Sequence, residues 1–209
     1  DIDNDGKDNL LIVLTDSTLM LFKNTAASNT EQPQWSTTGV LLKDDANATI
    51  DVGNYATPLV YDINKDGSKD LIIGTELGFL YYYKGATTAP GTTFFHKETN
   101  KLGGIQIAQY GQAYTHSAPF IGKIDNTGVE YLMIGTANGA IYRYDNFQNG
   151  NVTVPYTLLD SGYAKLQPGP WSSPVIADID GDTKYEMLVG TKLGGVKLYK
   201  QYINVNVDD

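Results

Sequence analysis

Short apolar runs alternate with polar, glycine-rich turns along the whole chain, and the runs recur in a fixed order. The first run of each group begins with proline and contains few polar residues, as expected for a strand covered on both faces. The second run ends in Gly-Thr, and the third is rich in aromatic residues, which favour strands. A more polar fourth segment begins with an aromatic residue. Each group therefore predicts four short strands, and no segment predicts a convincing helix.

The predicted strands occupy matching places in successive groups. The proline-led strands are expected at 58–61, 119–122 and 174–177, and the Gly-Thr strands at 71–75, 132–136 and 187–191. The aromatic strands are expected at 79–83, 140–144 and 196–199, and the polar strands near 34–42, 94–102 and 156–165. The stretch 85–93 has the composition of a turn.

A nine-residue loop that stands between the first and second strands of a group identifies the repeat. The loops begin at residues 1, 62, 123 and 178, which lie 61, 61 and 55 residues apart. A fixed period of this length indicates stacked or ringed structural units. The clearest copy is Asp62-Ile63-Asn64-Lys65-Asp66-Gly67-Ser68-Lys69-Asp70.

The loop carries oxygen-bearing side chains at positions 1, 3, 5 and 9 and a glycine at position 6. Alternate carboxylates and amides can surround one hard cation, and the glycine permits the backbone reversal that brings them together. Oxygen-only ligands in a flexible loop suit Ca²⁺. Without a cation, two carboxylates about 5 Å apart would repel by roughly 3 kcal/mol at an effective dielectric near 20. The pattern therefore predicts a calcium-binding loop.

Four-stranded antiparallel units of about 60 residues are typical of β-propeller blades. We therefore expect an all-β chain that forms a single β-propeller segment over residues 1–209, with about three and a half to four blades, as part of a larger propeller. The approximate blades are 1–52, which lacks its first strand, 53–113, 114–168 and 169–209. Residues 201–207 are expected to supply the last strand of the fourth blade or to complete the first.

Composition narrows the function classes. The 15 basic and 24 acidic residues give a net charge of −9, which excludes nucleic acid as an expected partner. No apolar run has the length of a membrane span, so membrane insertion is not expected. The chain has no cysteine. It begins on a candidate calcium ligand rather than on methionine, so we interpret the chain as a fragment of a longer protein. Loops that need near-millimolar calcium favour an extracellular or cell-surface location.

The combined motifs resemble a known family. Asp70-Leu71-Ile72-Ile73-Gly74-Thr75, followed by Gly78-Phe79-Leu80-Tyr81-Tyr82-Tyr83, is similar to the FG-GAP/VCBS repeats of integrin α-subunit propellers and of bacterial secreted or surface proteins. The resemblance covers nearly the whole chain. The literal Phe-Gly and Gly-Ala-Pro segments are absent, so the chain is closer to the looser bacterial form.

The resemblance implies calcium ligands at side chains 1, 3, 5 and 9 and at the carbonyl of position 7. The implied ligands of the first loop are Asp1, Asp3, Asp5, Asn9 and the Lys7 carbonyl. Those of the second are Asp62, Asn64, Asp66, Asp70 and the Ser68 carbonyl. Those of the fourth are Asp178, Asp180, Asp182, Glu186 and the Lys184 carbonyl.

The third loop departs from this pattern. It carries Lys123, Thr127 and Tyr131 where ligands are due, so we expect two to three calcium sites in the chain and no ion in the third loop. One hypothesis is that Lys123 places a fixed ammonium where the other blades hold an ion. The first loop depends on Asp1, and fraying of the terminus would empty it.

An EF-hand or dockerin loop is the rival interpretation of Asp-x-Asn-x-Asp-Gly. Such loops need a carboxylate at position 12 and a helix afterwards. Position 12 is Ile12, Ile73 or Val189, each inside a strand-like run. The three matched copies also argue against isolated solvated turns, so the propeller interpretation is preferred.

For function, we expect a non-catalytic recognition or adhesion module that binds a protein or carbohydrate through its loops. The remainder of the parent chain would complete the propeller. An enzyme is not excluded, since some polysaccharide lyases use calcium-containing propellers, but neither His96 nor His116 lies in a triad-like pattern. We expect His116 to be a rim residue. A propeller lectin is a further alternative that rests on Trp35 and Trp171, although such aromatic residues more often pack blades.

Overall fold

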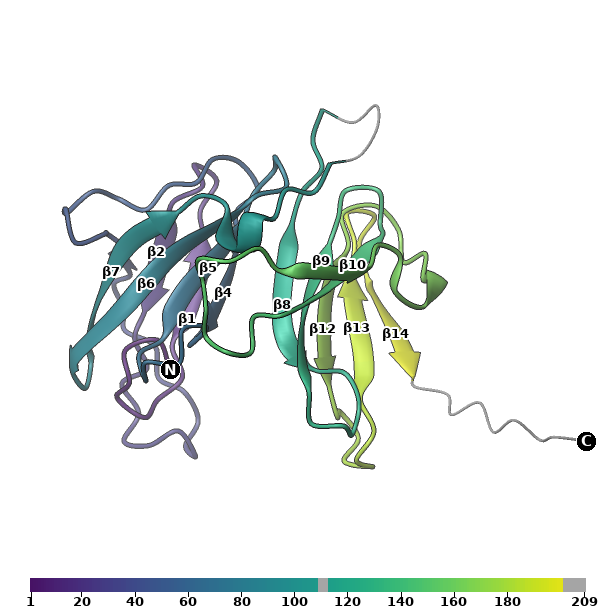
Figure 1. Cartoon of the computed structure of the whole chain (residues 1–209). Helices are drawn as coiled ribbons and strands as arrows, with labels where there is room; N and C mark the ends of the chain where they lie inside the picture. The colour runs from purple at the N-terminus through teal and green to yellow at the C-terminus, as the bar shows by residue number, and fades with distance from the viewer. Residues whose placement is uncertain (109–112, 201–209) are drawn as a thin grey trace, which may run out of the picture.

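The structure is a computed structural model, and it describes residues 1–108 and 113–200. The chain is all-β, with four antiparallel sheets of three or four strands. In every sheet, each strand is hydrogen-bonded to the strands that precede and follow it in the chain, so each sheet is a simple meander. Figure 1 shows the sheets following one another in chain order, with the first two (purple to blue) beside the last two (green to yellow).

We number the sheets 1 to 4 along the chain. Sheet 1 contains β1 (Leu10–Val13), β2 (Leu19–Phe22) and β3 (Val40–Leu41). Sheet 2 contains β4 (Thr57–Tyr61), β5 (Asp70–Gly74), β6 (Leu80–Ala89) and β7 (Thr92–Thr99). Sheet 3 contains β8 (Ala118–Lys123), β9 (Glu130–Gly135), β10 (Ile141–Asp145) and β11 (Thr157–Asp160). Sheet 4 contains β12 (Ser173–Ala177), β13 (Glu186–Gly190) and β14 (Val196–Lys200).

The core consists of three apolar clusters, one between each pair of successive sheets. Strand β5 shows how one strand serves two of them, because successive side chains point to opposite faces. Leu71 and Ile73 pack with Leu19 and Leu21 of sheet 1. Ile72, between them, packs against sheet 3. All three β5 side chains are fully buried, which explains why this strand is a continuous apolar run.

Strand β9 of sheet 3 divides its side chains between two clusters in the same way as β5. The cluster between sheets 2 and 3 includes Ile72, Leu80, Tyr82, Leu132, Ile134 and Tyr144. The cluster between sheets 3 and 4 includes Met133, Ile141, Ile176, Met187 and Val189. Burial of each of these side chains contributes about 2 kcal/mol, so the faces between sheets supply the main stabilisation.

The strands predicted from the apolar runs are confirmed for the first three strands of the groups that the structure describes, with small changes at their ends. The polar fourth strands are shorter than expected. Within 34–42 only Val40–Leu41 forms a strand, and Trp35 adds an isolated bridge to Asn24. Within 156–165 only Thr157–Asp160 forms a strand. Two short 3₁₀ turns, η1 (Leu102–Gly104) and η2 (Tyr163–Lys165), occupy the ends of the predicted strands 94–102 and 156–165. An outer strand with one exposed face has no apolar pattern that fixes its length.

The interpretation of 85–93 as a turn is wrong in part. Strand β6 continues to Ala89, and the chain reverses only near Gly91, which has a φ of 81°. The cause lies in a neighbouring loop: the Gly85 amide donates to Asp70 Oδ1 at 2.9 Å, and the Thr87 amide donates to Ser68 Oγ at 3.1 Å. These bonds hold the strand straight beyond its apolar part.

Successive sheets are joined by hydrogen bonds at one end. The Thr75 amide donates to Ser117 Oγ at 2.9 Å, and the Ser117 amide donates to the Thr75 carbonyl at 3.0 Å. Thr136 and Ser172 repeat the arrangement at 3.0 and 3.1 Å. Both serines are fully buried, so these bonds satisfy groups that would otherwise be costly. At the junction of sheets 1 and 2, Ala56 occupies the serine position.

Among the described residues, no helix has the length and apolar character needed to cross a membrane.

Candidate metal-binding loops

The acidic loops lie together at one end of the sheets. The second loop joins β4 to β5, the third joins β8 to β9 and the fourth joins β12 to β13, while the first leads into β1. In Figure 1 the N-terminus and the β8–β9 and β12–β13 hairpins all lie at the lower end. The first two loops also touch, because Asn4 Nδ2 donates to the Gly67 carbonyl at 2.9 Å.

Three of the four loops share one backbone conformation. Positions 4 and 6 are left-handed in the first, second and fourth loops. The φ angles are 54° and 83° at Asn4 and Gly6, 60° and 88° at Lys65 and Gly67, and 77° and 69° at Gly181 and Thr183. The fourth loop thus exchanges the usual order, with glycine at position 4 and the strained residue at position 6. This shared path directs the side chains of positions 1, 3 and 5 toward the same centre.

The first loop gathers three carboxylates. Asp1, Asp3 and Asp5 each present an oxygen within 4.8 Å of the others. Asp1 is held by the Asp5 and Gly6 amides at 3.1 and 2.9 Å. Asp3 is only 3% exposed, yet its Oδ1 has no hydrogen-bond partner, and Oδ2 lies 2.7 Å from Lys23 Nζ without the alignment of a hydrogen bond. A buried, unpartnered carboxylate oxygen beside two others fits a divalent cation.

The second loop combines two carboxylates with an amide. Asp62 accepts from the amides of Asp66 and Gly67 at 3.1 and 3.0 Å. Asn64 uses both ends of its amide on Asp66: Oδ1 accepts from the Asp66 backbone amide at 3.0 Å, and Nδ2 donates to Oδ2 at 2.9 Å. The three predicted side chains at positions 1, 3 and 5 therefore lie in one hydrogen-bonded group.

The fourth loop gathers Asp178, Asp180 and Asp182, whose oxygens lie within 4.8 Å of one another. Asp178 is held by the amides of Gly181 and Thr183 at 2.7 and 3.0 Å. All three carboxylates are exposed to solvent. This site matches the first in donor chemistry but lacks its burial, and its carboxylates are better hydrated in the absence of an ion.

Position 9 closes each of the three loops in the same way. Asn9, Asp70 and Glu186 accept from the amide of the second loop residue at 3.1, 3.0 and 3.1 Å. Asp70 also accepts from the amides of Asn64 and Gly85. Burial raises the pKa of the Asp70 carboxyl to about 6. The ninth side chain therefore has a structural role in the loop, in addition to the predicted ligand role.

Position 7 contributes its amide in all three loops. The amides of Lys7, Ser68 and Lys184 donate to the carboxylate at position 5 at 3.0, 3.0 and 2.8 Å. These bonds orient the fifth side chain and place the seventh residue next to it. Ligation by the carbonyls of these residues remains a prediction.

The third loop is built differently. Strand β8 extends through Lys123, which pairs with Glu130 of β9, so the ladder uses the first loop position. Asp125 Oδ1 accepts from the amide and hydroxyl of Thr127. In the part of the chain that the structure describes, Lys123 has no ion-pair partner within 4.0 Å, and no trio of carboxylates gathers in this loop. The geometry gives no support to a fixed ammonium from Lys123 in place of an ion.

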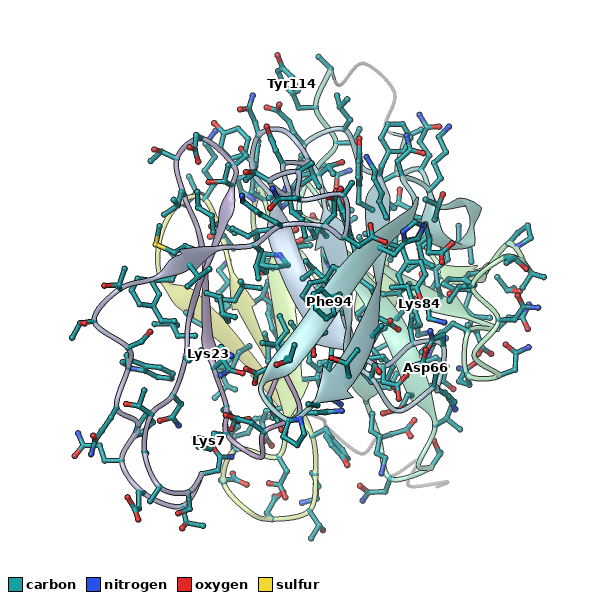
Figure 2. All side chains as sticks on the ribbon, turned by 90° about the vertical axis from the view of Figure 1, so that its left-hand side faces the viewer. Lys7, Lys23, Asp66, Lys84, Phe94 and Tyr114 are labelled. Atoms are coloured by element: carbon teal, nitrogen blue, oxygen red, sulfur yellow. The ribbon has the colours of Figure 1, made fainter. Side chains whose placement is uncertain are left out.

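Three lysines that the sequence interpretation overlooked contact the acidic loops. Lys23 lies 2.7 Å from Asp3, Lys84 lies 3.2 Å from Asp66, and Lys200 lies 2.9 Å from Asp180. Figure 2 shows Lys84 on the same side of the molecule as Asp66. The sequence contains a pattern that could have predicted these contacts, because each lysine directly follows the last aromatic residue of the third strand of its repeat. The third group, without a full ligand set, has Asp145 at this position.

Replacing Lys84 by glutamine is expected to tighten calcium binding at the second loop by about two- to fivefold. The lysine neutralises Asp66 in the ion-free loop and must yield to a cation, and an exposed pair of this kind is worth about 0 to 1 kcal/mol. Calorimetric titration measures the change. Lys65→Gln is the matched control, because Lys65 lies in the same loop with no ion pair within 4.0 Å among the described residues. Equal effects of the two changes would contradict a contact-specific role.

An aromatic cluster stands at the opposite end of the sheets. Tyr55, His116 and Trp171 each precede the proline of their repeat by three residues, with φ of 56°, 51° and 57°. The Trp171 ring lies 4.4 Å edge-on from Tyr55 and 4.8 Å from His116, with Lys192 Nζ 4.8 Å from its centre.

The expectation that His116 is a rim residue is wrong: it is 4% exposed. The stacked Trp171 ring covers the imidazole of His116.

Acidification is expected to destabilise the protein through His116. Burial lowers its pKa to about 4, against about 6.5 in an unfolded chain. The neutral ring therefore stabilises the fold fully above pH 6.5, and this stability, at most about 3 kcal/mol, is lost as pH falls toward 4. The raised pKa of Asp70 acts in the opposite direction. The measurement is therefore the free energy of unfolding of wild type and of His116→Phe as a function of pH, obtained by denaturant unfolding in the presence of chelator. Parallel pH profiles of the two proteins would contradict a contribution from His116.

No family model, no curated protein and no solved structure matches the chain. Function is therefore inferred from the repeat, from the geometry of the three acidic loops and from the surfaces described above. The structure brings together the predicted ligands at positions 1, 3 and 5 in the first and fourth loops as trios of carboxylates. In the second loop the corresponding group is a carboxylate–amide–carboxylate set.

Proposed function

We propose that the chain is a calcium-stabilised, non-catalytic recognition module built from β-propeller blades of the FG-GAP/VCBS type. The observation that carries this proposal is the recurrence of one loop conformation in three repeats, each with acidic or amide oxygens at positions 1, 3 and 5. A single acidic loop is commonly a solvated turn. Three loops with the same path and the same donors favour a shared ligand.

Calcium fits the donor sets. The residues that would hold it are the aspartates at positions 1, 3 and 5 of the first and fourth loops, and Asp62, Asn64 and Asp66 in the second. The ninth side chain and the seventh carbonyl would complete the shell. A bound cation supplies positive charge that offsets the repulsion between the carboxylates, about 3 kcal/mol for each pair held this closely. The chain's own contribution is the set of backbone amides that fix positions 1 and 5.

The packing of sheets supports a propeller arrangement. Every sheet from 1 to 4 is a meander, and the clusters between sheets involve consecutive repeats. The outer face of sheet 4 carries half-exposed Val175 and Leu198. A Cβ added at Gly190 would meet nothing within 4 Å, whereas the equivalent Gly74 and Gly135 face the next sheet. We propose that a further repeat of the parent protein covers this face.

A recognition role accounts for the site chemistry better than catalysis does. The carboxylates at positions 1 and 5 of the three loops accept hydrogen bonds from backbone amides. His116 is buried with no hydrogen bond to its Nδ1. His96 forms a surface pair with Asp45 at 2.7 Å. The alternative of a polysaccharide lyase predicts eliminative cleavage of polyuronides, which an absorbance assay detects directly. An extracellular or cell-surface setting is part of the proposal, since it provides the calcium that weak loops require.

Calcium titration of the purified chain tests the proposal. Calorimetry is expected to find three ions bound per chain, with affinities near 10⁻⁴ M. Magnesium is expected to bind more weakly, because it prefers a rigid octahedral shell. A chain that takes up no calcium at millimolar concentration would refute the proposed function.

A further inference from the structure

A hollow of about 650 Å³ lies at the end of the sheets away from the acidic loops. Its walls come from the β1–β2 turn, the segment before β4, the turn after β5 and the segment before β8. The lining includes Leu14, Thr15, Asn54, Tyr55, Glu76 and Tyr114. Figure 2 shows Tyr114 at the top of the molecule and Lys7 of the first loop near the bottom. The volume is that of a small-ligand site.

The hollow has a specific structural origin. At the later junctions, serines Ser117 and Ser172 fill this position and bond to the threonine of the preceding sheet. In sheet 1 the position of this threonine is occupied by Leu14, because the Ser17 amide donates to the Leu14 carbonyl as the Gly78 amide donates to that of Thr75. At the junction of sheets 1 and 2 the serine is replaced by Ala56, and the described residues contain no bond from the Ala56 amide to the Leu14 carbonyl. The two sheets are therefore not joined by hydrogen bonds at this end, and Leu14, Thr15 and Tyr55 line an opening there.

One wall of the hollow is an ordered aromatic surface. Tyr55 is 54% exposed, but its ring is supported at 4.4 Å by Trp171. Trp171 is itself stacked on buried His116. Tyr114, 53% exposed, supplies a second aromatic side chain. A ring that is exposed and also held in place loses little conformational freedom when a ligand packs on it.

The other wall carries a fixed pair of polar side chains. Asn54 Nδ2 donates to Glu76 Oε2 at 3.3 Å, and the Glu76 amide donates to the Asn54 carbonyl at 3.2 Å. Among the described residues, nothing donates to Glu76 Oε1 or Asn54 Oδ1. The pair therefore presents two acceptors, with the Thr15 hydroxyl in the same lining.

We propose that this hollow binds a neutral carbohydrate. A sugar ring offers an apolar C–H face, which packs on an aromatic side chain, and hydroxyls, which donate to carboxylate and amide oxygens. The carboxylate of Glu76 and the net charge of −9 disfavour anionic glycans such as polyuronides. A protein partner is disfavoured by shape, since stable protein interfaces need about 800 Å² of complementary surface on each partner rather than a concave pocket. The inference rests on the proposed recognition function and specifies its partner.

The test is a binding screen of the calcium-loaded chain against neutral oligosaccharides of glucose, galactose, mannose and N-acetylglucosamine, with oligogalacturonates as charged probes. Calorimetry or ligand-observed NMR then measures affinity for the best neutral probe. Tyr55→Ala is expected to weaken binding at least tenfold, whereas Tyr55→Phe, which keeps the ring, should retain it. Trp35→Ala is the matched control, because Trp35 is a 41% exposed aromatic residue outside the lining.

Binding of a neutral probe that is lost in Tyr55→Ala and kept in Trp35→Ala would support the site. Binding that survives Tyr55→Ala, preference for the oligogalacturonates, or no binding of any neutral probe would overturn it. Calcium uptake by each variant, measured in the same samples, shows that the fold is intact. Calcium uptake without sugar binding would therefore refute this inference alone, whereas absence of calcium uptake would refute the proposed function.

Discussion

Gly74→Ala and Gly135→Ala are each expected to lower the free energy of unfolding by about 3 kcal/mol or more, whereas Gly190→Ala should raise it by about 0.5 to 1 kcal/mol. The three glycines occupy the same place in successive repeats, at the end of the second strand. The contrast arises from what faces each of them. It is therefore a direct test of the order in which the sheets pack.

A Cβ at Gly74 would lie 1.8 Å from the carbonyl oxygen of Ser117, and one at Gly135 would lie 2.0 Å from that of Ser172. Both obstacles are backbone atoms of the next sheet, so relief requires the sheets to separate. Overpacking costs typically 1 to 3 kcal/mol where side chains can move, and more where they cannot. At Gly190 the space is open, and alanine in a strand is favoured over glycine by about 0.5 to 1 kcal/mol.

Urea unfolding followed by tyrosine and tryptophan fluorescence measures these differences. If the sheets separate only locally, the fourth loop should still bind calcium normally in Gly74→Ala and Gly135→Ala, although both variants have a lower free energy of unfolding. Three variants with equal stability would show that sheets 2, 3 and 4 do not pack face to face in this order.

Calcium at 1 mM is expected to raise the free energy of unfolding by about 4 kcal/mol relative to chelator. An ion that binds only the folded state with a Kd near 10⁻⁴ M contributes about 1.4 kcal/mol at this concentration, and three loops are expected to bind. For a chain of this size each kcal/mol moves Tm by about 2 to 4 °C. The expected rise in Tm is therefore about 8 to 16 °C.

Loop variants assign this effect to its sites. Asp66→Asn and Asp182→Asn should each remove about 1.4 kcal/mol of the calcium-dependent part, because they neutralise position 5 of the second and fourth loops. Asp125→Asn in the third loop is the matched control and should leave the calcium-dependent part intact. The quantity compared is the difference between calcium and chelator for each variant, so loss of local hydrogen bonds cancels. Equal stability of wild type with and without calcium would contradict calcium clips.

The strands and loops were predictable because their signals are local. Val, Ile, Leu and Tyr in short runs, proline at the strand start and glycine at the turn determine backbone conformation within a few residues. Repetition at 61, 61 and 55 residues then located equivalent elements without any alignment. The carboxylate trios of the first and fourth loops were predictable for the same reason, since all of their members lie within five residues.

What escaped prediction depends on contacts between residues that lie about 15 to 20 positions apart within one repeat. The extension of β6 to Ala89 follows from Asp70 in another loop, and the ion pairs of Lys23, Lys84 and Lys200 join residues about 20 positions apart. The outer strands were overestimated because one exposed face leaves no pattern to mark their ends.

The sequence by itself determined the unit: its strands, its acidic loop and the number of its copies, since each is encoded by neighbouring residues. Only the tertiary structure decided what happens between units. It placed Tyr55, His116 and Trp171 in one cluster although they lie more than fifty residues apart, and it left a hollow where Ala56 replaces a serine. Such features arise from the packing of separate sheets, and their geometry is not specified by any local pattern.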